Sequence, residues 1–545
     1  MKANLLAVNA KYVHSSLSVR FLAAGMEAYA RWHHNVSVAE ATINQNIKQI
    51  VDLAAENEPE AVGISTYIWN AGLLPDILTE LRRRLPRVTV VLGGPEAAHN
   101  AEYWLSRGAD FVLRGEGEHS LPMLLDALDE KDFGQLDDIP GLCFYKNKKP
   151  RFNPPEGLPG AYVNPYNDAY FQSLGGRIAY IETSRGCPFQ CAYCLSGGTG
   201  VRFLPLERAK EQIKRLAESG TRTVKFVDRT FNCNAARAYA ILEYVIGLPG
   251  DWCFHFEAAA DLFDERTLAL LNTAPPGRIQ IEIGLQSFHK PTLEAVARKT
   301  NLEKAEKNIR TLLAGQNIHL HVDLIAGLPF ETFPVFQSSF DRAYALEAHT
   351  LQMGFLKLLH GSRLREQAEV LGLVYQAEPP YEIISSPWLS EEEMLVLKRT
   401  ENALQNTYNK GRFLSSLRYS MSASGLGPFA LFRGLGEAAE SHATPLADYA
   451  GQVYRYLSTL PGVNENKLRD HMVCDFLSMT KGKTMPDFLK SRGEKQRRAV
   501  ETASRQLGRV IDYDEAAVLS SGGGVYADST DRNPVTGLYT LHFFE

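Results

Sequence analysis

Long hydrophobic runs are missing from this sequence, and so is an excess of positive charge. No uninterrupted apolar stretch approaches the about 18 residues of a membrane-spanning helix. Residues 1–16 have neither a long apolar region nor a small-residue cleavage site, so we expect no secretory signal. Seven cysteines in 545 residues are too few for a disulfide scaffold. The 58 basic residues do not outnumber the 63 acidic ones, so nucleic-acid binding is not indicated. These absences favour a soluble, cytoplasmic protein in a reducing environment.

The overall composition is that of folded globular chains, with 45% hydrophobic and 22% charged residues. At about 150 residues per domain, the length predicts three or four domains.

Residues 1–145 alternate between short apolar runs and helical patterns, which predicts a parallel α/β sheet. The expected strands are Leu5–Val8, Ala61–Ser65, Val88–Leu92 and Phe111–Leu113. Ligands of such sheets bind at the carboxyl ends of the strands, and these ends carry small, polar and glycine-rich residues. Ordinary strand-to-helix turns require the same residue types, so a ligand site does not follow from them alone.

The rest of the chain divides into three further segments. Residues 146–175 contain five prolines without apolar periodicity, which predicts a linker. Residues 176–375 return to alternating strands and helices and predict a partial parallel barrel, with catalytic groups at the strand carboxyl ends. Its expected strands are Ile178–Glu182, Thr223–Val227, Trp252–Glu257, Ile279–Leu285, His319–Leu324 and Leu351–Leu358. Residues 376–545 are mainly helical, with Ser390 as a helix N-cap and a terminal strand at 537–544.

Three of the seven cysteines lie within eight residues, directly after the first barrel strand. They are Cys187, Cys191 and Cys194, in the spacing C-x3-C-x2-C. Three thiolates can hold three irons of a 4Fe–4S cluster and leave the fourth iron open. A zinc site normally has four ligands, so zinc would need a distant fourth residue. The remaining alternative is a chance group of buried thiols.

This cysteine loop resembles that of the radical S-adenosylmethionine (radical SAM) superfamily. The resemblance implies that the cluster binds S-adenosylmethionine at its open iron and that Tyr193 contacts the adenine. Gln286 and Ser287, in a segment like the fourth strand of that family, would face the cofactor. Asp323 begins a segment like the fifth strand, beside the adenine. The Gly-Gly-Glu motif usual after the second strand is absent, and Asp228 stands in that region.

The N-terminal domain resembles the flavodoxin-like (Rossmann-type) cobalamin-binding domain of class B radical SAM enzymes. The resemblance rests on the segments ISTY, LGGPEA and LRGEGE at strand ends. It implies a corrinoid lined by Ser65, Thr66, Gly93, Gly94, Glu116 and Gly117. The Asp-x-His-x-x-Gly motif that supplies a cobalt-ligating histidine is absent, and we expect His14 to be a hydrogen-bonding loop residue. Methylthiotransferases carry three cysteines in this domain, whereas residues 1–180 contain only Cys143.

The C-terminal segments 379–389 and 406–413 resemble DUF4080, a domain of unknown function found in one family of cobalamin-type radical SAM proteins. The resemblance to this family does not indicate a substrate. Tyr381, Trp388, Tyr408 and Arg412 could face a substrate, but we expect core and surface positions for them.

The sequence therefore predicts an enzyme that uses a 4Fe–4S cluster, S-adenosylmethionine and cobalamin to functionalise an unactivated carbon of an unknown small-molecule or peptide substrate. C-methylation is one reaction that the resemblance allows, and electrons would come from a donor such as flavodoxin or ferredoxin. Two alternatives stay open. One is a cobalamin-independent radical SAM enzyme that performs oxidation, rearrangement or ring formation. The other is a non-catalytic protein that carries a corrinoid or a cluster.

Overall fold

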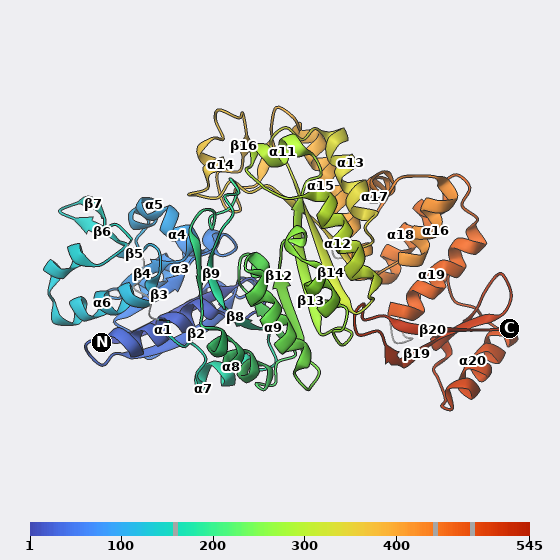
Figure 1. The fold of residues 1–545 in the computed structure, drawn as a ribbon, viewed down its shortest axis with the longest axis horizontal. Coiled ribbons are helices and arrows are strands. Elements are labelled where there is room, and N and C mark those ends of the chain that lie inside the picture. The colour runs from blue at the N-terminus through green and yellow to red at the C-terminus, as the bar shows by residue number, and fades with distance from the viewer. Residues whose placement is uncertain (156–161, 440–444, 480–484) are drawn as a thin grey trace. The chain divides into compact units, whose positions relative to one another are not determined.

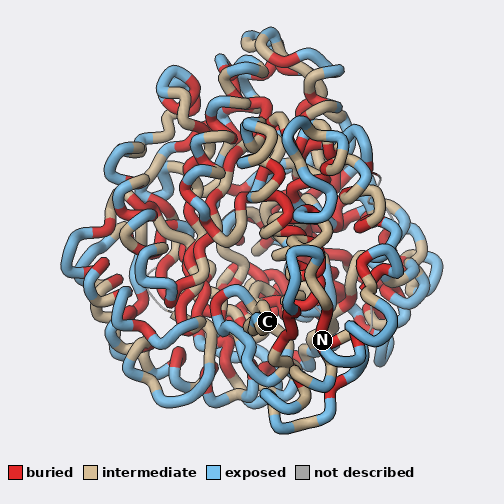
Figure 2. Tube along the Cα trace, turned by 90° about the vertical axis from the view of Figure 1, so that its right-hand side faces the viewer, coloured by how far each residue is buried: buried red, intermediate tan, exposed pale blue. Residues whose placement is uncertain are grey.

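The computed structural model describes residues 1–155, 162–439, 445–479 and 485–545. The chain forms two compact units (Figure 1). The first comprises Met1–Glu257 and Lys357–Ile383, and the second comprises Ala258–Leu356 and Ile384–Glu545. Figure 2 shows buried stretches on the inside and exposed turns at the surface. Within the described ranges, no helix has the length and apolar character needed to cross a membrane.

The first unit begins with a seven-stranded sheet in the order β2-β1-β3-β4-β5-β6-β7. Its strands are β1 (Lys2–Asn9), β2 (Asn35–Thr42), β3 (Ala61–Ser65), β4 (Thr89–Gly93), β5 (Phe111–Leu113), β6 (Leu142–Lys146) and β7 (Lys149–Phe152). Strands β1 to β5 pair in parallel, and β6 and β7 add antiparallel strands at one edge. The order 2-1-3-4-5 is that of flavodoxin-like sheets, as the sequence predicts.

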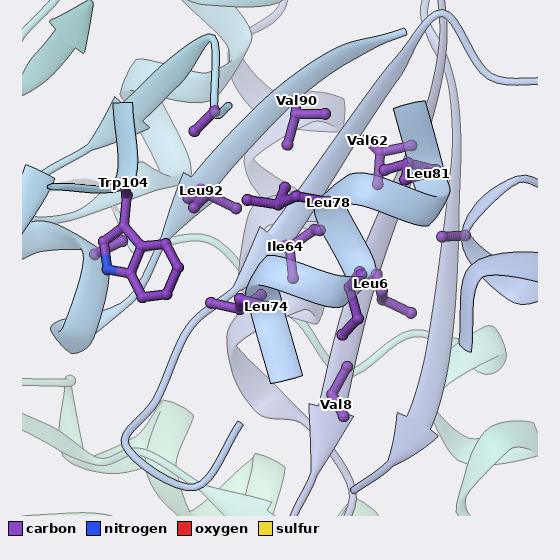
Figure 3. Close-up of a cluster of buried hydrophobic side chains, with 14 of the residues drawn as sticks. Leu6, Val8, Val62, Ile64, Leu74, Leu78, Leu81, Val90, Leu92 and Trp104 are labelled. Carbon is purple, nitrogen blue, oxygen red and sulfur yellow. The ribbon is translucent and has the colours of Figure 1, made fainter. Parts of the chain in front are cut away.

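Helices cover both faces of this sheet. They are α1 (Leu17–Tyr29), α2 (Ile47–Ala54), α3 (Leu74–Arg84), α4 (Pro95–His99), α5 (Ala101–Ser106) and α6 (Gly117–Glu130). One core joins the sheet to α2, α3 and α5 around Ile64, Leu78 and Trp104 (Figure 3). A second core joins the opposite face to α1 and α6 through Val19 and Leu124. Burial on both faces explains why the central strands are short and continuously apolar.

The Pro-rich segment 146–175 contains regular structure that its sequence does not predict. Strand β7 extends the first sheet, and helix α7 (Asp168–Leu174) begins after the N-cap Asn167. The side chain of Asn167 accepts a hydrogen bond from the backbone of Tyr170, which stabilises the first turn. The expected linker is therefore only partly irregular.

The first unit continues with the segment that carries the three cysteines. Its strands are β8 (Ala179–Ile181), β9 (Ser184–Cys187), β10 (Gly200–Phe203), β11 (Thr223–Phe226), β12 (Cys253–Glu257) and β16 (Val374–Tyr375), and its helices are α8 (Leu206–Ala217), α9 (Ala235–Gly247) and α14 (Arg363–Glu366). Strands β8, β11 and β12 pair in parallel, whereas β9 and β10 form an antiparallel hairpin. The phenyl rings of Phe226 and Phe256 stack in the core beneath the parallel strands.

The second unit begins with three parallel strands and their helices. They are β13 (Ile279–Gln286), β14 (Ile318–Ala326), β15 (Thr350–Phe355), α10 (Glu265–Leu271), α11 (Lys290–Ala295), α12 (Leu302–Ala314) and α13 (Phe333–Tyr344). Burial alternates strictly along β13 and β14. The less buried face carries polar side chains such as Glu282, His321 and Asp323. Closed barrels fill their interiors with branched apolar residues, so this polar face is suited to a ligand.

The C-terminal part of the second unit is mainly helical. Its helices are α15 (Glu391–Asn406), α16 (Leu414–Ser424), α17 (Pro428–Ala438), α18 (Leu446–Ser458), α19 (Glu465–Met479) and α20 (Glu494–Leu507). They are preceded by β17 (Ile383–Ser385) and followed by an antiparallel sheet of β18 (Ala516–Val518), β19 (Gly524–Arg532) and β20 (Tyr539–Phe544). Ser390 caps α15 in a reciprocal capping box with Glu393, which confirms the expected helix start.

Candidate functional site

The three cysteines lie at the end of β9 and in the loop that follows it. Cys187 ends β9, directly opposite Gly200 of β10. Gly186 has φ of +98°, and a Cβ atom there would lie 1.9 Å from the carbonyl oxygen of Gly200, so only glycine fits this hairpin. Cys187 and Cys191 are buried, whereas Cys194 is exposed. The loop therefore holds two thiols inside the protein and presents one at its surface.

The loop offers ligands and hydrogen-bond donors that fit an iron–sulfur cluster. None of the three cysteines is in a disulfide, the Thr230 hydroxyl lies 3.5 Å from the Cys187 sulfur, and the Ser196 amide donates to the Cys194 sulfur at 3.4 Å. A donor to sulfur such as the Ser196 amide tunes the reduction potential of a cluster. In the described part of the chain, no three His, Cys, Asp or Glu side chains form a preassembled metal site.

Asp228 supports the base of this loop. Its buried carboxylate accepts hydrogen bonds from the amide and hydroxyl of Thr183, at 2.7 and 2.6 Å, and from the hydroxyl of Ser184 at 2.6 Å. Burial raises the pKa of this carboxyl, and the three donors counteract that shift. Asp228 thus fixes the end of β8 to the end of β11, next to Cys187.

Residues after the sixth barrel strand lie against the cysteine loop. The Leu364 amide donates to the carbonyl oxygen of Ala192 at 2.8 Å, and Arg363 donates to that of Gln190 at 3.1 Å. Both carbonyls flank Cys191. Tyr193, expected beside the adenine, is half-buried in the same stretch.

At the carboxyl edge of the first sheet, Thr66 and Gly94 build a turn. The amide and hydroxyl of Thr66 both donate to the carbonyl oxygen of Gly93 at 2.7 Å, and its hydroxyl accepts from the Ala97 amide. Gly94 has φ of +95°, and a Cβ atom there would lie 2.5 Å from the Thr66 carbonyl oxygen. The Thr66 hydroxyl therefore both donates and accepts a hydrogen bond within the protein, and these bonds shape this edge of the sheet. Ser65 is buried beside it, and Gly93 is half-buried.

Exposed aromatic side chains lie at the same edge, and our sequence analysis missed them. Tyr67 and Trp69 stack with 4.2 Å between ring centroids, and the Trp69 indole donates to the carbonyl oxygen of Val8 at 3.0 Å. Trp69 is 44% exposed, and Tyr12, in the loop after β1, is 75% exposed. Aromatic rings grouped at the ligand-binding edge of a sheet are suited to contact with a ligand. These rings offer the kind of surface on which a flat apolar macrocycle such as a corrin packs. The run Tyr-Ile-Trp shortly after a buried strand was the signal in the sequence for these side chains.

His14 is a hydrogen-bonding loop residue, as expected. Its Nδ1 atom lies 2.6 Å from the Tyr180 hydroxyl, and burial lowers its pKa, helped by the nearby Lys11 and Lys225. This contact ties the loop after β1 to β8.

Glu116 takes part in an ion-pair network. Its carboxylate pairs with Arg185, at 2.9 Å, and with Arg202. These charged residues line a cavity of about 380 Å³ together with the aromatic residues Phe21, Tyr162 and Phe203. Gly117 begins α6 and packs closely on Leu22 of α1.

In the second unit, the structure places Gln286 and Ser287 at the carboxyl end of β13. Gln286 adopts φ of +70° after a bulge in the strand, and its buried Oε1 atom has no hydrogen-bond partner. The Ser287 hydroxyl donates to Glu331 at 2.5 Å, and Ser339 donates to the same oxygen at 3.0 Å. Burial raises the pKa of Glu331 to about 7. Asp323 lies on the half-buried face of β14. The unused oxygen of Gln286 fits a site that receives a polar ligand such as S-adenosylmethionine.

The four residues for which we expected core and surface positions are buried or half-buried. Tyr381 is buried, and its hydroxyl donates to Glu96 at 2.7 Å. In the second unit, Trp388 packs on Phe330, and the Tyr408 hydroxyl donates to the carbonyl oxygen of Ala348. Arg412 is half-buried.

Sequence comparisons identify three domains. The B12 binding domain matches residues 3–125, the Radical SAM superfamily matches 181–342, and DUF4080, a protein family of unknown function, matches 369–516. The chain thus combines a B12-binding domain, a radical SAM domain and a DUF4080 domain. The first two are the domains of cobalamin-dependent radical SAM enzymes, and the chain is similar to enzymes of this type.

Several curated proteins are similar to this chain. The uncharacterized methyltransferase PH0819 of Pyrococcus horikoshii is 25% identical over 63% of the chain and 77% of its own length. The hopanoid C-3 methylase of Methylococcus capsulatus is 30% identical over 36% of the chain, and the cobalamin-dependent radical SAM methyltransferase TokK of Streptomyces tokunonensis is 25% identical over 50%. The chain spans only 39% and 43% of the lengths of the last two.

Solved structures share the fold. The radical S-adenosylmethionine methyltransferase TsrM from Kitasatospora setae, with cobalamin and a 4Fe–4S cluster bound, matches with a TM-score of 0.54 and 20% identity over 69% of this chain and 76% of its own. The cobalamin-dependent S-adenosylmethionine radical enzyme OxsB matches with a TM-score of 0.58 and 14% identity over 87% of this chain and 78% of its own. The expected flavodoxin-like and radical SAM architecture is confirmed.

Proposed function

We propose that this protein transfers a methyl group to an unactivated carbon of a small-molecule or peptide substrate. The proposal rests on one observation. Within the first unit, contacts join the carboxyl edge of the flavodoxin-like sheet to the segment that carries the three cysteines. His14, Glu116 and Glu118 at the carboxyl edge of the flavodoxin-like sheet contact Tyr180 and Arg185, next to the cysteine loop. The methyltransferase names of similar proteins support the same reaction class.

The chain itself would hold the cofactors and orient the substrate. Cys187, Cys191 and Cys194 would bind the cluster, and Tyr193 of the same unit would contact the adenine of S-adenosylmethionine. In the second unit, Gln286, Ser287 and Asp323 are the residues that would face this cofactor. The corrinoid edge would be shaped by Ser65, Thr66, Gly93, Gly94, Glu116 and Gly117, with the half-buried ring of Tyr67 and the exposed ring of Trp69 beside it. When bound, these cofactors supply a carbon-centred radical and a methyl group. The protein must keep the reacting carbon in a fixed place and exclude water.

Thr66 and Glu116 act on this edge through their bonds to neighbouring protein groups. Thr66 holds the β4–α4 turn, and Glu116 holds the hairpin of β9 and β10. We further propose that a small redox protein such as flavodoxin or ferredoxin supplies the electron. The exposed Cys194 end of the loop is the side from which an electron would enter.

The first experiment combines cofactor content with product analysis. The protein is purified anaerobically after expression with hydroxocobalamin, reconstituted with iron and sulfide, and reduced with S-adenosylmethionine. Near-stoichiometric cobalt, 5′-deoxyadenosine and S-adenosylhomocysteine together are expected. Cobalt and 5′-deoxyadenosine without S-adenosylhomocysteine would contradict methyl transfer, and the absence of cobalt would contradict the role of the first domain.

The cysteine assignment predicts a sharp contrast between two substitutions. Cys191→Ala is expected to abolish 5′-deoxyadenosine formation and the cluster absorbance, because three thiolates are the minimum set for the three irons. Cys474→Ala is the matched control, since Cys474 is a half-buried free thiol of α19. It is expected to leave both readouts at the wild-type level. Cleavage that survives Cys191→Ala would overturn the assignment.

A further inference from the structure

Arg185 lies two residues before Cys187 and is surrounded by carboxylates. Its guanidinium nitrogens lie 2.9 Å from Glu116, 2.8 Å from Glu118 and 2.6 Å from Glu182. The Nε atom also donates to both oxygens of Glu182, at 3.2 and 3.1 Å. Arginine suits this position because its planar fork can serve several oxygens at once, which a lysine ammonium cannot do in a fixed geometry.

The neighbouring strand carries a second arginine. Without a carboxylate partner, the positive charges of the two arginines would repel each other. Arg202 of β10 is directly opposite Arg185 of β9 in the antiparallel register. Like charges directly opposite each other destabilise a strand pair. Glu116 offsets this repulsion, because one of its oxygens pairs with Arg185 and the other with Arg202. The hairpin of β9 and β10 thus presents two neighbouring positively charged side chains to the first sheet.

The first sheet presents the complementary charge at its ligand-binding edge. Glu116 is the N-cap of α6 and Glu118 lies in its first turn, directly after β5. Carboxylates are favoured at a helix N-terminus, so both are stable there as anions. The network therefore links the carboxyl end of β5 to the strand that ends in Cys187.

A second, separate set of contacts joins the same two regions. Tyr381 bonds Glu96 at α4, while Leu364 and Arg363 bond the backbone beside Cys191. Because these contacts do not involve Arg185, its loss should leave the first unit folded. Partly exposed ion pairs also contribute little to stability. What the loss of Arg185 removes is the link from the strand that ends in Cys187 to Glu116 and Glu118, while Arg202 still pairs with Glu116.

From this geometry we infer that Arg185 is a positioning residue, which holds the cysteine loop at a fixed distance from the cobalamin-binding edge through Glu116 and Glu118. The inference rests on the proposed function, since it requires both cofactors to bind. Group transfer between bound partners depends steeply on their separation, and a displacement of about 1 Å can cost on the order of 100-fold in rate. A rigid link between the two cofactor sites is therefore a requirement of the reaction.

The test measures the relative position of the two cofactors directly. Wild type, Arg185→Gln and Arg31→Gln are loaded with cluster and cobalamin, and the magnetic interaction between cob(II)alamin and the reduced cluster is measured by pulsed electron paramagnetic resonance. Arg31 is the control because it pairs with Asp126 and Glu130 in the same domain, outside this network. Arg185→Gln is expected to retain cobalt and iron but to show a shifted and broader distance distribution. Arg31→Gln is expected to match wild type.

A second variant covers the case in which Arg185→Gln does not fold or load. Glu118→Gln removes one carboxylate from the opposite side of the link and is expected to broaden the distribution in the same way. If every loaded variant of the network shows the wild-type distribution of distances between the two cofactors, the inference is overturned and the proposed function is left intact. A wild-type protein that binds no cobalamin would overturn both.

Discussion

At the scale of single residues, Glu331 shows how burial changes a carboxyl group. It is completely buried, and its Oε1 atom accepts hydrogen bonds from the hydroxyls of Ser287 and Ser339. Burial raises its pKa from 4.5 to about 7, because desolvation of the anion outweighs the two hydroxyl donors. Between these two values the folded protein keeps a proton that the unfolded chain releases. The stability contributed by Glu331 is therefore present below pH 4.5 and is lost as the pH rises to about 7.

Replacement of this carboxyl by an amide should remove that pH dependence. Glu331→Gln keeps an oxygen that can accept both serine hydrogen bonds but cannot ionise. Above pH 7 we expect the variant to be more stable than wild type by on the order of 3 kcal/mol, and near pH 4.5 the two should be similar. Thermal unfolding of both proteins from pH 5 to pH 8 measures the difference. A difference that does not change with pH would contradict the shifted pKa.

At the scale of elements, helix α16 begins without a capping side chain of its own. Its N-cap is Phe413, in the left-handed region, and Asp475 of α19 supplies the missing acceptor. The Asp475 carboxylate accepts hydrogen bonds from the amides of Ser415 and Ser416, at 2.8 and 3.0 Å, and from the Ser416 hydroxyl at 2.6 Å. This residue caps α16 from a distance of about 60 residues in the chain and thereby joins two helices of the C-terminal region.

Removal of this cap should destabilise the C-terminal helices. Asp475→Ala leaves two helix amides and a hydroxyl without their buried acceptor, so we expect a loss of about 2–3 kcal/mol. Asp448→Ala is the matched control, because Asp448 is an exposed carboxylate in the first turn of α18. We expect that change to stay within about 0.5 kcal/mol. Chemical denaturation followed by circular dichroism compares the two, and equal effects would contradict the capping role.

The elements that the sequence predicts correctly are those with strong apolar patterns. The expected barrel strand at 252–257 is β12 (Cys253–Glu257), and the expected strand at 319–324 is the core of β14. Strand β2 was missed because it is an edge strand, half-exposed along most of its length. Strand β7 was missed because its lysine and proline residues are exposed, as edge strands allow.

At the scale of the whole molecule, the sequence reveals the cluster ligands more readily than the long-range contacts between side chains. The three cysteines are close in sequence, so their spacing alone indicates a cluster. Arg185 and Glu118 are separated by 67 residues, and their ion pair depends on which strands become neighbours. Glu116 was expected to line the corrinoid, but no pattern in the sequence shows that its carboxylate pairs with two arginines. Long-range polar contacts follow from the packing of elements, which a single sequence does not specify.

The contact between Tyr381 and Glu96 is a long-range example in the first unit, since the two residues are 285 positions apart in the sequence. Both are buried, and burial raises the pKa of Glu96, so loss of its donor should be costly. Tyr381→Phe removes only the hydroxyl, and we expect a loss of about 1–3 kcal/mol. Amide exchange should rise in residues 95–100 and 357–383 together, because the bond joins these two segments. Tyr408→Phe removes a hydroxyl in the second unit and should leave both segments unchanged. An exchange increase confined to one segment would show that the bond does not couple the end of the barrel segment to the cobalamin-binding domain.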